Sequence, residues 1–147
     1  MRHEPVAVVA TLPAGDPGQL AAPANARVAR FIPHGPVLDR ATCAITHGGM
    51  GATQKALARG VPVCAVPFGR DQQEVARRVE VAGAGSRLPA SRLRPDRLRA
   101  KVREAMTMTE GAKRIREAFA AAGGPPAAAS ILQARLLTKQ TPHTPAT

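Results

Sequence analysis

The segment from Thr46 to Thr53 gives the clearest indication of a binding site in this sequence. A histidine and three glycines follow an apolar run and precede a helical pattern. Backbone N–H groups at such a helix start lack internal partners, and the helix dipole favours an anion there. Glycines let a phosphate approach the backbone, and His47 can donate a hydrogen bond of about 1.5–3 kcal/mol to it. A plain tight turn with His47 as a bystander is the alternative, and this motif alone leaves both interpretations open.

Two further segments suggest what such a site would bind. Asp71 and Gln72 place a carboxylate beside a carboxamide, which suits hydrogen bonding to the hydroxyls of a hexose. The alternative for Asp71 is to cap the helix that starts at Gln72. Phe31–His34 ends another apolar run, where an aromatic followed by proline can wall a slot for a flat base. Ordinary core packing of Phe31 is the alternative.

The hydrophobic pattern predicts the elements that position these residues. Short apolar runs predict strands over 5–10, 27–32, 42–46 and 63–67, with a short edge strand at 86–88. The run 5–10 is typical of a strand buried on both faces. Wider spacing predicts helices over 50–59, 72–81, from Pro95 onward, 109–122 with Ile115 and Phe119 inward, and 127–137 after a Gly-Pro break. Alternating strands and helices predict an α/β fold with a doubly wound parallel sheet, whose rim collects the loops after the strands.

Composition narrows the class of partner. The 147 residues carry a net charge of +11, with three Phe and no Trp or Tyr. Basic residues concentrate between Arg87 and Arg116, where acidic residues interleave with them as on a solvated helix face. The near absence of stacking aromatics argues against a nucleic-acid partner. Cys43 and Cys64 each lie in an apolar run, which favours buried free thiols over a disulfide framework or metal site.

The apolar segments are short. None approaches the roughly 20 residues of a membrane helix. The run after Glu4 is also too short for a signal peptide. The sequence therefore predicts a cytoplasmic protein with no membrane span.

Together, the segments resemble the C-terminal domain of the UDP-glycosyltransferase-like superfamily. The segments that carry the resemblance are Phe31–His34, Thr46–Gly51, Ala56–Pro62, Val66–Gln72, 76–79 and 83–85. The resemblance is to bacterial macrolide and natural-product glycosyltransferases of the GT-B fold, and it covers most of positions 6–120. It implies a Rossmann-like domain, the C-terminal half of a GT-B fold, that looks to be without its first strand and helix.

The resemblance implies a role for each motif. The donor diphosphate would lie against His47, Gly48, Gly49, Met50, Gly51, Ala52 and Thr53. The sugar hydroxyls would bond to Asp71 and Gln72, and the nucleobase would lie against Phe31, Ile32, Pro33 and His34. Relatives commonly place a Glu for the ribose where this chain has Lys55, which can only donate. Lys55 is therefore an uncertain ribose or phosphate contact, and a cation near a helix N-terminus is expected to be mildly unfavourable.

The expected organisation has three parts. A partial nucleotide-sugar-binding domain spans 1–122, a C-terminal helix spans 123–139, and a disordered tail spans 140–147. In the family, an N-terminal domain binds the acceptor and supplies a histidine general base, and nothing in this sequence corresponds to it. No catalytic residue is predicted within the chain. Neither a cofactor nor a metal is expected, because His47 and the helix dipole offset the phosphate charge.

The resemblance implies the donor-binding part of an inverting hexosyltransferase. Its donor would be a UDP- or dTDP-hexose and its acceptor a hydroxyl group, and the chain is expected to be truncated and inactive alone. One alternative is a donor-binding subunit that pairs with an acceptor-binding partner chain. Another is a basic module for nucleotides or nucleic acid, which the interleaved charges disfavour.

Overall fold

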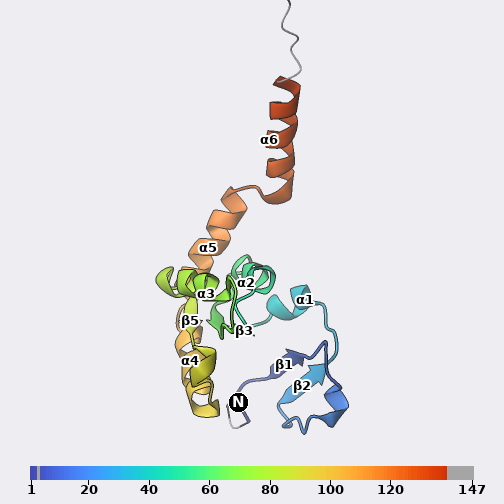
Figure 1. Cartoon of the computed structure of the whole chain (residues 1–147), viewed down its shortest axis with the longest axis vertical. Helices are drawn as coiled ribbons and strands as arrows, with labels where there is room; N and C mark the ends of the chain where they lie inside the picture. The colour runs from blue at the N-terminus through green and yellow to red at the C-terminus, as the bar shows by residue number, and fades with distance from the viewer. Residues whose placement is uncertain (3, 139–147) are drawn as a thin grey trace, which may run out of the picture.

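The computed structural model describes residues 1–2 and 4–138. The expected tail 140–147 and the end of the expected helix 123–139 lie outside the described residues. In the described part, the strands form two parallel sheets (Figure 1). One sheet pairs β1 (Val8–Thr11) with β2 (Ala26–Ala29), and the other has the order β3 (Ala44–Thr46), β4 (Val63–Ala65), β5 (Gly85–Arg87). Parallel strands alternating with helices confirm the predicted α/β class.

The helices follow the strands as the spacing predicts. They are α1 (His34–Leu38), α2 (Met50–Leu57), α3 (Gln72–Val81), α4 (Pro95–Met106), α5 (Thr109–Ala121) and α6 (Gly124–Thr138), with 3₁₀ turns at Pro17–Gln19 and Ala90–Arg92. The predicted break after α5 is shorter than expected. Gly123 and Gly124 have φ values of +72° and +58°, and α6 begins at once. Proline is tolerated in the first turn of a helix, where its missing N–H would have no partner.

The strand β4 lies at the centre of the larger sheet and is buried along its whole length. Its side chains alternate between two faces, as in any strand. Val63 and Ala65 join a core formed with α2, α3 and α5. Cys64 faces the opposite side and packs with Val102 and Ala105 of α4. The β3–β4–β5 sheet is therefore covered by helices on both faces.

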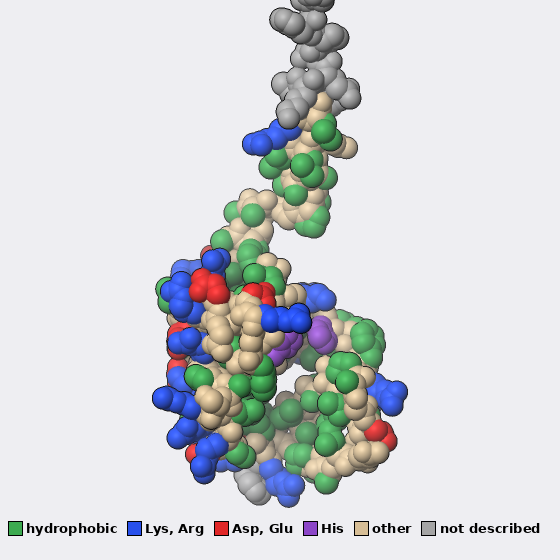
Figure 2. All heavy atoms as spheres, viewed as in Figure 1, with side chains coloured by type: hydrophobic (Ala, Val, Ile, Leu, Met, Phe, Trp, Pro, Cys, Tyr) green, Lys and Arg blue, Asp and Glu red, His purple; other side chains and the backbone are tan. Residues whose placement is uncertain are grey.

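The β1–β2 sheet stands apart from this core (Figure 1). Figure 2 shows an open space between the two parts of the molecule. Glu4 holds the chain start to α4 through ion pairs with Arg103 and Arg99 at 2.8 and 3.4 Å. A further ion pair joins the segment after β2 to the larger sheet's helices: Arg59, just beyond α2, pairs with Asp39, which follows α1, at 2.8 Å.

Two expectations about burial are wrong. The run 5–10 is not buried on both faces: Val9 is 46% exposed, because β1 has only β2 as a neighbour. Ile115 packs against the core as predicted, but Phe119 is 39% exposed where α5 extends past the sheet. Beyond it, α6 projects away from the core (Figure 1). No helix in the described part is both long and apolar enough to cross a bilayer.

Candidate functional site

The turn after β3 is pressed against the start of α3. The Gly48 N–H donates to Thr46 Oγ1 at 2.7 Å, and Gly48 has a φ of +84°. A Cβ on Gly48 would lie 3.0 Å from the carbonyl oxygen of Gln72. Only glycine fits this left-handed, crowded position without strain. The structure therefore brings the loops after β3 and β4 together at one rim, as the strand pattern predicts.

The N-terminus of α2 presents free donors at this rim. Gly49 occupies the N-cap and no side chain caps the helix. Among residues 1–2 and 4–138, no hydrogen-bond partner is found for the N–H groups of Met50, Gly51 or Ala52. His47 Nε2 lies where a Cβ of Gly49 would be, so the imidazole covers the helix end. Space around Gly51 is open, and the arrangement suits an anion.

Thr53 does not face the open rim. Its N–H donates to the Gly49 carbonyl at 3.1 Å, and the residue is only 2% exposed. Its buried Oγ1 finds no partner within the described part of the chain. Thr53 is therefore placed beneath the turn, and its predicted contact with a diphosphate does not fit this geometry.

The loop after β4 is closed by Gln72 rather than by Asp71. Gln72 Oε1 accepts from the N–H groups of Phe68 and Gly69 at 2.9 and 3.2 Å. Asp71 has helical φ and ψ of −68° and −12° and makes no capping bond, so the capping alternative is wrong. Its exposed carboxylate can accept from a ligand, while Gln72 keeps only its NH2 donors for one.

Unlike the carboxylate of Asp71, the neighbouring carboxylate of Glu74 is engaged in ion pairs with arginines. Hydrogen bonds from Arg77 and Arg78 lower the pKa of Glu74 to about 2. Glu74 is therefore charged and paired within α3. Asp71, by contrast, has no ion pair within the part of the chain that the structure describes.

Arg70 is a candidate site residue that the sequence does not single out. It has a φ of +56°, in the left-handed region that costs a non-glycine residue about 1–2 kcal/mol. Strain of this kind gathers at functional sites. No sequence signal marks it, because Gly69 beside it is the residue expected to take such a conformation. Arg70 places an exposed cation between Gly69 and Asp71.

The Phe31–His34 segment follows β2 and leads into α1. Phe31 is 79% exposed, so its core-packing alternative is wrong. His34 is the exposed first residue of α1. Figure 2 shows the histidine side chains at the upper margin of the open space. No hydrogen bond or ion pair of the described residues joins this segment to the two glycine-containing loops.

Lys55 lies in the last turn of α2 rather than near its start. The expected unfavourable contact with the helix N-terminus is therefore wrong, because cations are favoured near a C-terminus. Its side chain is exposed, and its carbonyl accepts from Arg59 Nη1 at 3.2 Å. Nothing in this geometry directs Lys55 toward the turn after β3.

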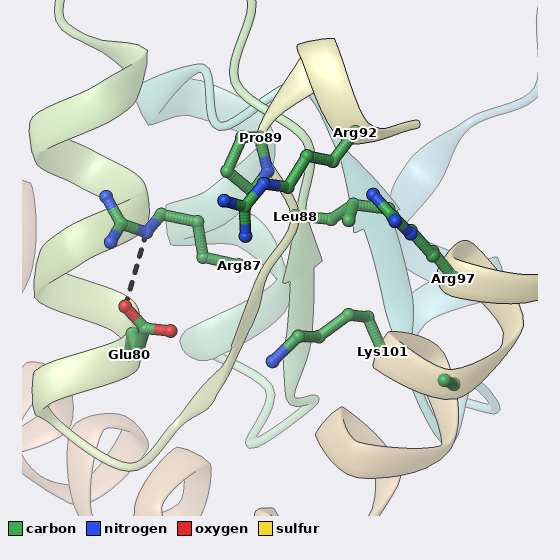
Figure 3. A pocket seen from close by; sticks show the side chains of 8 residues that line it. Glu80, Arg87, Leu88, Pro89, Arg92, Arg97 and Lys101 are labelled. Carbon is green, nitrogen blue, oxygen red and sulfur yellow. Dashed lines mark ion pairs between the residues drawn. The ribbon is translucent and has the colours of Figure 1, made fainter. Parts of the chain in front are cut away.

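A separate basic hollow of about 690 Å³ lies between α3, β5 and α4, and none of the residues of these two loops lines it (Figure 3). It is lined by Glu80, Arg87, Leu88, Pro89, Arg92, Arg97, Ala100 and Lys101. Arg87 Nε lies 3.2 Å from Glu80 Oε2, yet this buried nitrogen makes no aligned hydrogen bond, so the contact is one of charge alone. The described residues hold no cluster of three or more His, Cys, Asp or Glu suited to a metal.

Comparison with known proteins identifies the family of the chain. Residues 4–135 match the family described as erythromycin biosynthesis protein CIII-like, C-terminal domain. The chain is 40% identical over 122 residues to 4'-demethylrebeccamycin synthase of Lentzea aerocolonigenes, covering 80% of this chain and 28% of that protein.

Solved structures show the same fold. The calicheamicin glycosyltransferase CalG4 is similar with a TM-score of 0.82 and 27% identity, over 97% of this chain and 46% of that one. The glycosyltransferase VinC, solved in complex with dTDP, has a TM-score of 0.73 and 30% identity, over 79% of this chain and 30% of that one. The chain thus spans less than half of each protein compared.

Proposed function

The chain belongs to the erythromycin biosynthesis protein CIII-like C-terminal domain family, and from this premise we propose that it is the donor-binding part of a glycosyltransferase. The donor would be a UDP- or dTDP-hexose, and the acceptor a hydroxyl group. One observation carries the proposal: the uncapped start of α2, with His47 over it, lies beside the loop that bears Asp71. The dTDP in the VinC structure, a protein similar to this chain, supports the ligand class.

The diphosphate would occupy the turn after β3. The unpaired N–H groups of Met50, Gly51 and Ala52 would donate hydrogen bonds to the diphosphate, whose negative charge the α2 dipole favours. His47 would donate to a phosphate oxygen, and Arg70 would add positive charge from the facing loop. Such donors need no metal to offset the charge of the diphosphate. Open space around Gly51 and Gly69 leaves room for the ligand.

The sugar would lie against the loop after β4. Asp71 would accept hydrogen bonds from hydroxyl groups, and the Gln72 NH2 would donate to one, because its Oε1 already closes the loop. Phe31–His34 would approach the base from the opposite side. Their exposure is consistent with a surface that a ligand covers.

In the proposed reaction the acceptor oxygen directly displaces the nucleoside diphosphate at the anomeric carbon, with inversion. The acceptor oxygen gives its proton to a general base and bonds to the anomeric carbon. The bond from that carbon to the phosphate oxygen breaks, and its electron pair leaves with the nucleoside diphosphate. His47 and the α2 N–H groups stabilise this leaving group, whose charge grows in the transition state. The base would come from an acceptor-binding domain or partner chain, so this chain alone is expected to bind without transferring.

The first test is ligand binding. A dye-based thermal melt with UDP, dTDP and their glucose conjugates suits a chain without Trp or Tyr. We expect each nucleotide to raise the melting temperature. His47→Ala should weaken binding by roughly 10- to 150-fold, as the loss of a charge-assisted bond of about 1.5–3 kcal/mol implies. Gln54→Ala, an exposed change on the same helix, is the matched control. A cooperative melt that ignores every nucleotide contradicts the proposal.

A second variant separates the sugar from the diphosphate. Asp71→Asn keeps the side-chain size but removes the charge that accepts hydroxyl hydrogen bonds. UDP-glucose affinity should fall about tenfold, whereas UDP affinity should stay within about twofold of the parent. An equal loss for both ligands would place Asp71 at the diphosphate instead.

A further inference from the structure

The basic hollow between α3, β5 and α4 carries more positive charge than the residues around it neutralise. Its lining holds one carboxylate, Glu80, and four cations, Arg87, Arg92, Arg97 and Lys101. Figure 3 shows that these cations come from the end of β5, from the 3₁₀ turn Ala90–Arg92 and from α4. Cations that separate elements bring to one space create a positive potential, which attracts an anion.

Two of the four cations are neutralised within the protein. Arg87 Nε lies 3.2 Å from Glu80 Oε2. Lys101 Nζ donates to both carboxylate oxygens of Glu104, at 2.9 and 2.7 Å. Each of these pairs has no net charge, so the excess charge of the hollow belongs to the other two cations.

Arg92 and Arg97 have no such partner. Neither side chain forms an ion pair or a hydrogen bond with any residue in the described ranges 1–2 and 4–138. The other cations from 94 to 103 are all in ion pairs, namely Arg94, Arg99, Lys101 and Arg103. The hollow therefore has two uncompensated positive charges, both on exposed arginines.

The position of Arg97 is electrostatically unfavourable for the chain by itself. Arg97 lies in the first turn of α4, where the helix dipole disfavours a cation. Asp96 in the same turn is paired with Arg94 instead. A carboxylate three or four positions away would also offset the charge, but those positions hold Leu93, Arg94, Ala100 and Lys101. Exceptions to such local rules are expected at functional sites.

The walls of the hollow are fixed by the fold. β5 packs against both α3 and α4, and Ser86 Oγ donates to the Lys101 carbonyl at 2.6 Å, which ties the strand to α4. Leu88, just after β5, is only 3% exposed. The 3₁₀ turn is closed by the Arg92 N–H, which donates to the Pro89 carbonyl at 2.9 Å. A ligand would therefore need to order side chains but not the backbone, which reduces the entropy lost on binding.

Charge and size narrow the class of ligand. Two uncompensated guanidinium groups match a phosphate monoester, which carries a charge of about −1.5 to −2 at pH 7 and three acceptor oxygens. Arginine also binds phosphate through two parallel hydrogen bonds. A hollow of about 690 Å³ has room for a small molecule attached to that phosphate. Nucleic acid suits the hollow less well, because no aromatic side chain lines it for stacking on a base.

We propose that the basic hollow binds the phosphate monoester group of a small polar metabolite about the size of a sugar phosphate. Arg92 and Arg97 would donate to the phosphate oxygens, and the rest of the molecule would lie against Leu88 and Pro89. None of the residues assigned to the diphosphate and the sugar lines this hollow. The inference therefore does not rest on the proposed function.

Titration of the whole chain with glucose 6-phosphate, followed by the NMR shifts of its amides, tests the proposal. We expect a Kd of about 1 mM or tighter, with shifts at Leu88, Arg92 and Ala100. Glucose 6-sulfate has a similar shape but a single charge, so it should bind at least about tenfold more weakly. Shifts at Met50–Ala52 alone, no shifts at all, or equal affinity for the sulfate ester would overturn the proposal.

Three substitutions localise the binding. Arg92→Gln and Arg97→Gln should each weaken glucose 6-phosphate binding at least about tenfold. Ala100→Phe keeps every charge but fills part of the hollow, so it should weaken binding as well. Arg94→Gln is the matched control, because it lowers the net charge equally at a residue outside the lining, and affinity should change by less than about twofold. Equal losses in Arg92→Gln and Arg94→Gln would indicate attraction to the overall charge of +11 and overturn the proposal.

The stability of the free protein distinguishes a ligand contact from a structural role. Without ligand, Arg97→Gln should have a urea midpoint no lower than that of the parent, because it removes a cation from the first turn of α4. A lower midpoint would show that Arg97 supports the fold and would overturn its assignment to the ligand. Binding in the hollow is measured at its own amides, so this proposal and the proposed function can each fail alone.

Discussion

Replacing Gly48 with alanine tests whether the turn after β3 needs a residue without a side chain. Gly48 has a φ of +84°, where a side chain costs about 1–2 kcal/mol. The new Cβ would also lie 3.0 Å from the Gln72 carbonyl oxygen, so α3 must shift slightly. We therefore expect Gly48→Ala to lower the free energy of unfolding by at least about 1 kcal/mol.

Gly51→Ala is the matched control, three residues away. Gly51 lies in α2, and, apart from its own chain neighbours and the backbone of its helix, no atom lies within 4 Å of a Cβ built there. Alanine is favoured over glycine in helices by about 0.5–1 kcal/mol, so this variant should be more stable than the parent. Urea denaturation followed by circular dichroism measures both changes. Nucleotide binding should nevertheless fall in both variants, because the methyl of Gly51→Ala enters the space proposed for the phosphate.

Gly48→Ala and Gly51→Ala are expected to change stability in opposite directions. If both variants shift the urea midpoint in the same direction, the left-handed turn or the open space at Gly51 is misplaced. If Gly48→Ala changes stability by less than about 0.5 kcal/mol, the contact with Gln72 does not constrain the loops. A stable Gly51→Ala protein with unchanged nucleotide affinity would show that the phosphate does not bind at the start of α2.

Four further outcomes follow from the core and its edges. Gly111→Ala should lower the free energy of unfolding by about 1–3 kcal/mol in urea, because its Cβ would collide with the Gly83 carbonyl. Burial raises the pKa of Cys43 from 9.0 to about 12, so its alkylation near pH 8 should be at least about tenfold slower in the folded chain than in urea. Because the unfolded thiol loses its proton first, stability should fall between pH 9 and 12, and less so in Cys43→Ala. Asp39→Asn should cost less than about 1 kcal/mol, because its ion pair with Arg59 is exposed.

The sequence predicts elements well where one local signal decides them. The bounds of α3 agree with the predicted 72–81, because the apolar stripe of Val75, Ala76 and Val79 is buried and Gly83 takes a φ of +63° past the helix end. The split sheet could not be predicted in this way. The apolar residues of 5–10 are typical of a buried strand. Burial depends, however, on which strands lie alongside, and β1 has one neighbour.

The sequence indicates which loops form the candidate site, but not which residues of those loops contact one another. The glycines of 48–51 indicate an anion site, yet the contact of Gly48 with Gln72 is tertiary and leaves no local mark. Asp71 before a helix is a typical N-cap. In the structure Gln72 already bonds the two N–H groups that close the loop, so Asp71 takes helical angles and makes no capping bond.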